Sequence, residues 1–170
     1  MPEILPFRID IPPADLEDLT RRLDHARWPK PVPSGWERGV PAHELSHLLE
    51  HWRHSYDWRE QEARLNELPQ FITEIDGDGV HFVHLRSDNP DAQALVLTHG
   101  YPSSFTEFQR VLEPLHHDFH LVVPSLPGYL FSAPPSGTWT MTRTATAWAE
   151  LMRRLGYDRY GVHGGDIGAG

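Results

Sequence analysis

The sequence of 170 residues contains no cysteine. This absence excludes a disulfide scaffold, a thiolate metal site and a cysteine nucleophile, and it agrees with a reducing cytoplasm. Clustered basic residues are also lacking, and the formal net charge is -9. Because phosphate binding relies on grouped Lys and Arg side chains, neither nucleic acid nor an anionic membrane is an expected partner.

Long apolar runs are missing as well. No stretch approaches the roughly 20 residues that a helix needs to cross a bilayer. Residues 1–10 contain no basic segment followed by an apolar one, so the sequence predicts no signal peptide. We therefore expect a cytoplasmic protein.

The first 69 residues read as a meander of extended and helical segments. Leu16, Leu19 and Leu23 repeat at helical spacing on one face. Three proline residues end this first helix, since proline lacks the backbone donor. The spacing predicts helices over 13–26, 41–56 and 58–68.

Residues 70–170 change to an alternation of strands and helices. Two strand-like runs flank the turn Asp76-Gly77-Asp78-Gly79 and predict a β-hairpin. Such an alternation predicts an α/β fold with a mostly parallel sheet and flanking helices. The elements predicted after the hairpin are strands over 94–98, 120–123 and 159–163, and helices over 104–116 and 141–155.

The last predicted strand leads into the run Gly164-Gly165-Asp166-Ile167-Gly168. Small residues two positions before and two after a nucleophile allow the tight turn of a nucleophile elbow, where an esterase would have serine. A helix beginning at this turn would favour the ionised carboxylate of Asp166. Asp166 is therefore the candidate nucleophile.

A covalent ester on the carboxylate can be hydrolysed only if hydrogen-bond donors stabilise the negative charge that develops on its oxygen. One candidate donor is the backbone N–H of Ile167. The other is the backbone N–H of Tyr101, in the loop that follows strand 94–98. In that loop, Gly100 permits close approach and Pro102 fixes the turn, and the adjoining His99 is a candidate general base.

Three motifs together resemble the epoxide hydrolases of the α/β-hydrolase fold. They are His99-Gly100-Tyr101-Pro102, Pro124-Ser125-Leu126-Pro127-Gly128 and Gly164-Gly165-Asp166-Ile167-Gly168. Upstream, residues 56–77 resemble the N-terminal meander of the microsomal-type branch. The resemblance implies two domains: the meander at 1–69 and the first half of the hydrolase core at 70–170.

The resemblance also implies the chemistry. Asp166 would attack a carbon of a small-molecule epoxide to form an ester, and water would hydrolyse that ester without any cofactor. Two cap-domain tyrosines and a histidine with an acidic partner would assist, whereas His99 would be a structural residue that packs under the oxyanion loop and not the base. We expect these groups, the cap and the C-terminal half of the fold to lie beyond Gly170, so the chain alone should not turn over.

Some residues depart from the family pattern. The family more often has Trp and Gly where this chain has Tyr101 and Ser103, and Gly where it has Leu130. The first change is mild because the expected donor is a backbone group. The other two could alter the loop or narrow the pocket.

The sequence also bears on functions other than epoxide hydrolysis. A haloalkane dehalogenase would share the aspartate nucleophile and the oxyanion loop, but the long meander argues against it. An inert fragment with an interaction role, and a homodimer, stay open. Dinucleotide and P-loop glycine patterns are absent.

Histidines raise two further questions. His43, His47, His51 and His54 fall on one side of a predicted helix, where a solvated face is favoured over zinc binding. His163 precedes the elbow on a predicted buried strand, which favours a hydrogen-bonded core residue.

Overall fold

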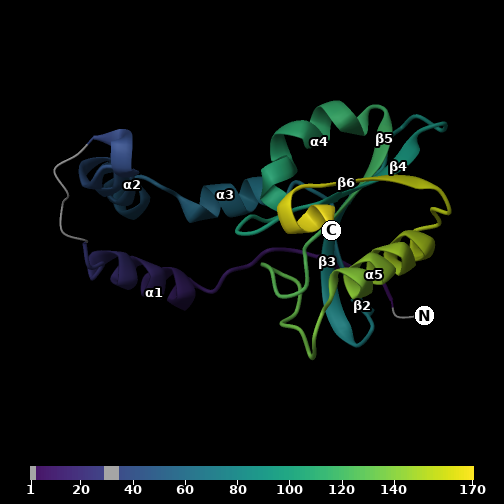
Figure 1. The fold of residues 1–170 in the computed structure, drawn as a ribbon, viewed down its shortest axis with the longest axis horizontal. Helices are drawn as coiled ribbons and strands as arrows, with labels where there is room; N and C mark the ends of the chain where they lie inside the picture. Colours follow the sequence, from purple (N-terminus) through teal and green to yellow (C-terminus); the bar gives the residue numbers. More distant parts are fainter. Residues whose placement is uncertain (1–2, 29–34) are drawn as a thin grey trace. The chain divides into compact units, whose positions relative to one another are not determined.

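The computed structural model describes residues 3–28 and 35–170 and separates into two compact units (Figure 1). The helical unit is Ile9–Leu65. The core unit combines the described residues up to Arg8 with Asn66–Gly170. Residues up to Arg8 belong to the core unit because strand β1 (Leu5–Phe7) pairs with strand β2 (Gln70–Ile75).

The helical unit has the three helices that the leucine and proline spacing predicts. They are α1 (Pro13–Asp24), α2 (Ala42–His54) and α3 (Trp58–Leu65), with a short 3-10 turn at Trp36–Arg38. Proline directly precedes the first residue of α2 and lies at both the cap and the first position of α1. Part of the proline-rich segment that should end the first helix lies outside the described residues. Arg53 joins α2 to α1 through Asp24, with Nε 3.0 Å from Oδ1.

Six strands of the core unit form one sheet in the order β1-β2-β3-β5-β4-β6. The remaining strands are β3 (Asp78–Leu85), β4 (Gln93–Thr98), β5 (Phe119–Pro124) and β6 (Tyr160–Gly164). The hairpin turn predicted between β2 and β3 is present, with φ of 54° at Asp76 and 85° at Gly77.

The sheet of the described residues is mixed: the strands that alternate with helices pair in parallel, as predicted, and the strands before them pair antiparallel. β4 pairs in parallel with β5 and β6, whereas β1/β2, β2/β3 and β3/β5 are antiparallel. The turn at Asp76 and Gly77 accounts for the antiparallel β2/β3 pair, whereas the β1/β2 and β3/β5 pairs join segments distant in sequence. A two-residue turn can join only antiparallel strands, while the parallel pairs need the helical crossovers that follow Thr98.

Helices cover both faces of this sheet (Figure 1). A 3-10 turn at Phe105–Phe108 leads into α4 (Gln109–His116) on one face, and α5 (Met141–Arg154) lies on the other. Trp148, Leu151 and Met152 of α5 are buried against strand residues such as Val96 and Val122.

Within the described residues the side chain of His163 is exposed, so its expected place in the core stays a prediction. His163 lies on β6, which stands last in the sheet order and pairs with β4 alone among the described strands. Its ring centroid is 6.3 Å from that of Phe108. None of the helices in the described part of the chain combines the length and apolar character needed to cross a bilayer.

Candidate active site

A sharp turn joins β6 to a 3-10 segment at Asp166–Ala169. Asp166 has a φ of 52°, a left-handed conformation that side-chain-bearing residues rarely adopt. A Cβ on Gly164 would lie 2.0 Å from the carbonyl oxygen of Gly168, and one on Gly168 would lie 2.4 Å from that of Thr98. Only glycine permits this closeness at either position.

The loop after β4 meets this turn directly. A Cβ on Gly100 would lie 2.5 Å from the Cβ of Asp166 and 2.9 Å from the carbonyl oxygen of Gly165. The missing side chain of Gly100 therefore allows the two segments, 65 residues apart in sequence, to touch. By contrast, a Cβ on Gly165 would meet nothing within 4 Å.

Backbone amides hold the carboxylate of Asp166. The N–H of Tyr101 donates to its Oδ1 at 3.0 Å. Hydrogen bonds from the backbone of Tyr101 and then of Ile167 lower the pKa of Asp166 and outweigh the opposing effect of burial. Asp166 is exposed and ionised at neutral pH.

His99 is fully buried and uses both of its ring nitrogens. Nε2 accepts from the N–H of Leu126 at 3.0 Å, and Nδ1 lies 3.1 Å from the carbonyl oxygen of Gly100. Burial lowers the pKa of His99, so the ring is neutral with its proton on Nδ1. This arrangement leaves His99 no free nitrogen with which to act as a base.

The structure shows the local environment of two residues that depart from the family pattern, Ser103 and Leu130. The N–H of Ser103 donates to the carbonyl oxygen of Gly100 at 3.0 Å and closes the turn that includes the cis peptide bond Tyr101–Pro102. Leu130 is 56% exposed and has a φ of 45°, the region that favours the glycine found more often in the family.

A cavity of about 290 Å³ lies beside the turn. Apolar residues dominate its lining, which includes Leu126, Tyr129, Trp139, Trp148 and Ile167. Neither Asp166 nor Tyr101 reaches it. The cavity therefore lies under the turn and does not face the carboxylate.

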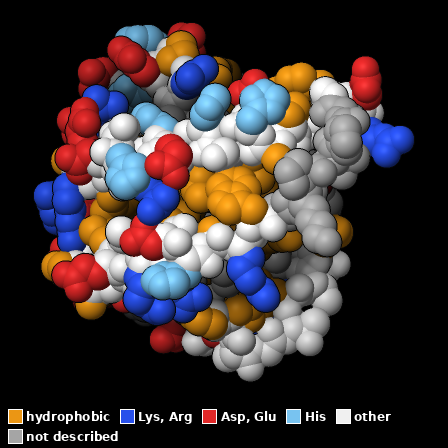
Figure 2. All heavy atoms as spheres, turned by 90° about the vertical axis from the view of Figure 1, so that its left-hand side faces the viewer, with side chains coloured by type: hydrophobic (Ala, Val, Ile, Leu, Met, Phe, Trp, Pro, Cys, Tyr) orange, Lys and Arg blue, Asp and Glu red, His pale blue; other side chains and the backbone are white. Residues whose placement is uncertain are grey.

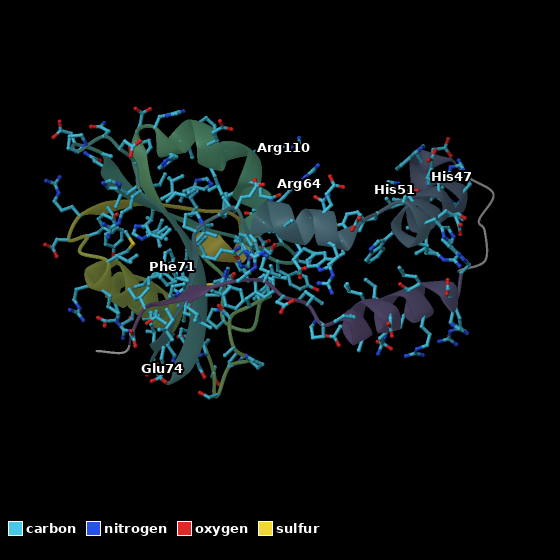
Figure 3. All side chains as sticks on the ribbon, turned by 180° about the vertical axis from the view of Figure 1, so that it is seen from behind. His47, His51, Arg64, Phe71, Glu74 and Arg110 are labelled. Atoms are coloured by element: carbon cyan, nitrogen blue, oxygen red, sulfur yellow. The ribbon has the colours of Figure 1, made fainter. Side chains whose placement is uncertain are left out.

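The histidines of α2 are all exposed. Figure 3 labels His47 and His51 on this helix, and Figure 2 shows histidine side chains scattered among acidic and basic ones. The rings of His43 and His47 stand 6.3 Å apart, edge to face. Within residues 3–28 and 35–170, no three potential metal ligands come together.

The fold and the turn at Asp166 define an α/β-hydrolase, and residues 93–170 match the model of the alpha/beta hydrolase fold. Residues 4–108 match the model described as epoxide hydrolase N terminus. The chain belongs to the epoxide hydrolase family, as its motifs predicted. The match includes the meander that argued against a dehalogenase.

Individual proteins that are similar to this chain are also named as epoxide hydrolases. A putative epoxide hydrolase of Stigmatella aurantiaca is 46% identical over 98% of this chain and 41% of its own length. Epoxide hydrolase 1 of Oryctolagus cuniculus is 34% identical over 98% of this chain and 40% of its own. The solved structure of Aspergillus niger epoxide hydrolase has a TM-score of 0.88 and 38% identity, covering 98% of this chain and 47% of that one. The chain thus spans less than half the length of these relatives.

Proposed function

We propose that this chain is the nucleophile-bearing part of an enzyme that hydrolyses epoxides to vicinal diols through an ester on Asp166. The observation that carries the proposal is the hydrogen bond from the Tyr101 N–H to Asp166 Oδ1 at 3.0 Å, at a turn that requires glycine. Membership of the epoxide hydrolase family supports the substrate class.

In the first step, a carboxylate oxygen of Asp166 attacks one oxirane carbon. The ring carbon–oxygen bond breaks, and the released oxygen becomes a hydroxyl group by taking a proton from the cap-domain tyrosines that the family resemblance implies. The amides of Tyr101 and Ile167 hold the carboxylate ionised and restrict its orientation, which favours attack by the free oxygen.

In the second step, water adds to the ester carbonyl carbon of Asp166, and a negative charge develops on its oxygen. The N–H groups of Tyr101 and Ile167 are placed to stabilise this charge, an effect worth about 100- to 1,000-fold in rate for one donor. Collapse of the intermediate releases the diol and leaves one oxygen of the water in the carboxylate. Because both nitrogens of His99 are engaged, the base that activates this water is another group.

The test uses the full protein encoded by the gene. After brief exposure to an epoxide, mass spectrometry should find an ester on the peptide that contains Asp166, and turnover in heavy-oxygen water should label the same peptide. Asp166→Asn should abolish both signals. Asp158→Asn, at an exposed site, is the matched control and should change neither.

An Asp166→Asn protein that turns over epoxide without first deamidating would contradict the mechanism. Label in the diol alone, with none in the protein after many turnovers, would do the same, since it would mean that water attacks the epoxide directly.

A further inference from the structure

His81, on β3, is the centre of a buried hydrogen-bond network. Its side chain is 0% exposed. Nδ1 lies 2.9 Å from Ser125 Oγ, and Nε2 lies 3.0 Å from Gln70 Oε1. An amide oxygen can only accept, so Nε2 carries the proton and Nδ1 accepts from the Ser125 hydroxyl. Burial lowers the pKa of His81 to about 4, which keeps the ring neutral.

The backbone of His81 also makes hydrogen bonds to Ser125 and to Ser132. The N–H of Ser125 donates to the carbonyl oxygen of His81 at 2.9 Å, and the N–H of His81 donates to Ser132 Oγ at 3.0 Å. The Ser132 hydroxyl in turn donates to the carbonyl oxygen of Ser125 at 2.8 Å. One residue of β3 therefore anchors both ends of the loop 125–132.

The ring of His81 also packs among three aromatic rings. Its centroid is 5.0 Å from that of Phe7, 5.3 Å from that of Phe105 and 5.3 Å from that of Phe131. Phe105 is fully buried and follows the loop that contains Tyr101. His81 consequently contacts the continuation of the oxyanion loop as well as the loop 125–132.

Ser125 is adjacent to Leu126, whose N–H holds Nε2 of His99. This bond leaves the proton of His99 on Nδ1, which donates to the carbonyl oxygen of Gly100. That oxygen and the N–H of Tyr101 belong to one planar peptide and point in opposite directions. The same oxygen also accepts from the N–H of Ser103 at 3.0 Å, and holding it from both sides aims the N–H of Tyr101 at Asp166.

We propose that His81 is a positioning residue for the Gly100–Tyr101 peptide, acting through Ser125, Leu126 and His99. Its part in catalysis rests on the proposed function. His81 touches no reacting atom; its hydrogen bonds keep Leu126 where His99 can bind it, and so keep the amide of Tyr101 directed at the nucleophile.

The experiment uses the full protein encoded by the gene, with His81→Leu as the test and His84→Leu as the matched control. His84 lies on the same strand, is also buried and bonds the Tyr157 hydroxyl at 3.0 Å, but it has no link to Ser125. His81→Asn retains an amide that can reach Ser125 and should rescue in part. Ser125→Ala removes only the hydroxyl and is informative even where His81→Leu fails to fold.

Two measurements are made. Single-turnover ester formation at saturating epoxide should slow by about 10- to 100-fold in His81→Leu, because small displacements of a catalytic group have effects of this size. His84→Leu should leave the rate unchanged. Nitrogen NMR of labelled histidine should show His99 as the pure Nδ1–H form in the parent protein, and as a mixture of tautomers in His81→Leu and Ser125→Ala.

The proposal is overturned if the His99 spectrum is the same in all variants, or if His84→Leu slows ester formation as much as His81→Leu does. If the parent protein forms no ester on Asp166, the proposed function fails. In that case the His99 spectrum alone decides whether His81 positions the peptide.

Discussion

Gly100 and Gly165 flank the same carboxylate but have different surroundings. A methyl group on Gly100 would collide with Asp166, whereas one on Gly165 would extend into open space from an ordinary extended backbone. We expect Gly100→Ala to displace the oxyanion loop and slow ester formation on Asp166 by about 100-fold or more. Gly165→Ala should react normally. Single-turnover kinetics on both variants checks this, and equal rates would show that the contact at Gly100 is unimportant.

Strand β3 has two buried histidines, and burial lowers the pKa of His81 and of His84 to about 4. In the unfolded chain both would titrate near 6.5, so the unfolded state binds more protons between these values. The two neutral histidines therefore make their whole contribution to the free energy of unfolding above about pH 6.5. As the pH drops towards 4, the free energy of unfolding falls by up to about 3 kcal/mol for each histidine.

Urea unfolding at several pH values between 7 and 5 measures how steeply the free energy of unfolding falls with pH. His84→Gln should reduce it by removing one of the two titrating groups. A free energy of unfolding that does not change over this range would mean that the two histidines bind protons equally in the folded and unfolded states, which would contradict the lowered pKa values.

At the scale of the whole molecule, the helical unit has its own internal connections. Glu62 accepts from the N–H of Ile11 at 2.7 Å, from Trp58 Nε1 at 3.2 Å and from Arg59 Nη1 at 2.6 Å. These bonds join α3 to the segment before α1. The pair between Arg64 and Glu60, on the same helix, is exposed at both ends.

We expect Glu62→Gln to destabilise the helical unit by about 1–3 kcal/mol, because it weakens bonds to a buried carboxylate. Glu60→Gln should have an effect below about 1 kcal/mol. Hydrogen exchange by mass spectrometry should show faster exchange for the first variant in residues 9–28 and 58–65, with strands β2 to β5 unchanged. Faster exchange spread equally over the sheet would contradict this view of the unit.

Several features could be predicted from local sequence. The helices of residues 9–65, the hairpin at Asp76 and Gly77, and the strand before the elbow all depend on neighbours within a few positions, through periodicity, proline and glycine. The candidate nucleophile was also a local pattern, since glycine on both sides of Asp166 is a requirement of a single turn.

Other features could not be predicted because they join distant segments. The antiparallel contact of β3 with β5 joins segments that are far apart along the chain, and the strand order decides it. In the sequence, nothing distinguishes His81 from other polar residues in a strand. Its two ring nitrogens form hydrogen bonds with Ser125, 44 residues away, and with Gln70, and only the fold brings these residues together.

By itself, the sequence determined the local elements, the glycine-flanked aspartate and the family, because each of these is written in short runs of neighbouring residues. Only the tertiary structure decided how closely the predicted amides approach Asp166, which histidine nitrogens are engaged and which histidines are buried. The physical reason is that a hydrogen bond or a buried ring depends on where the folded backbone brings distant residues together, and spacing along the chain does not carry that information.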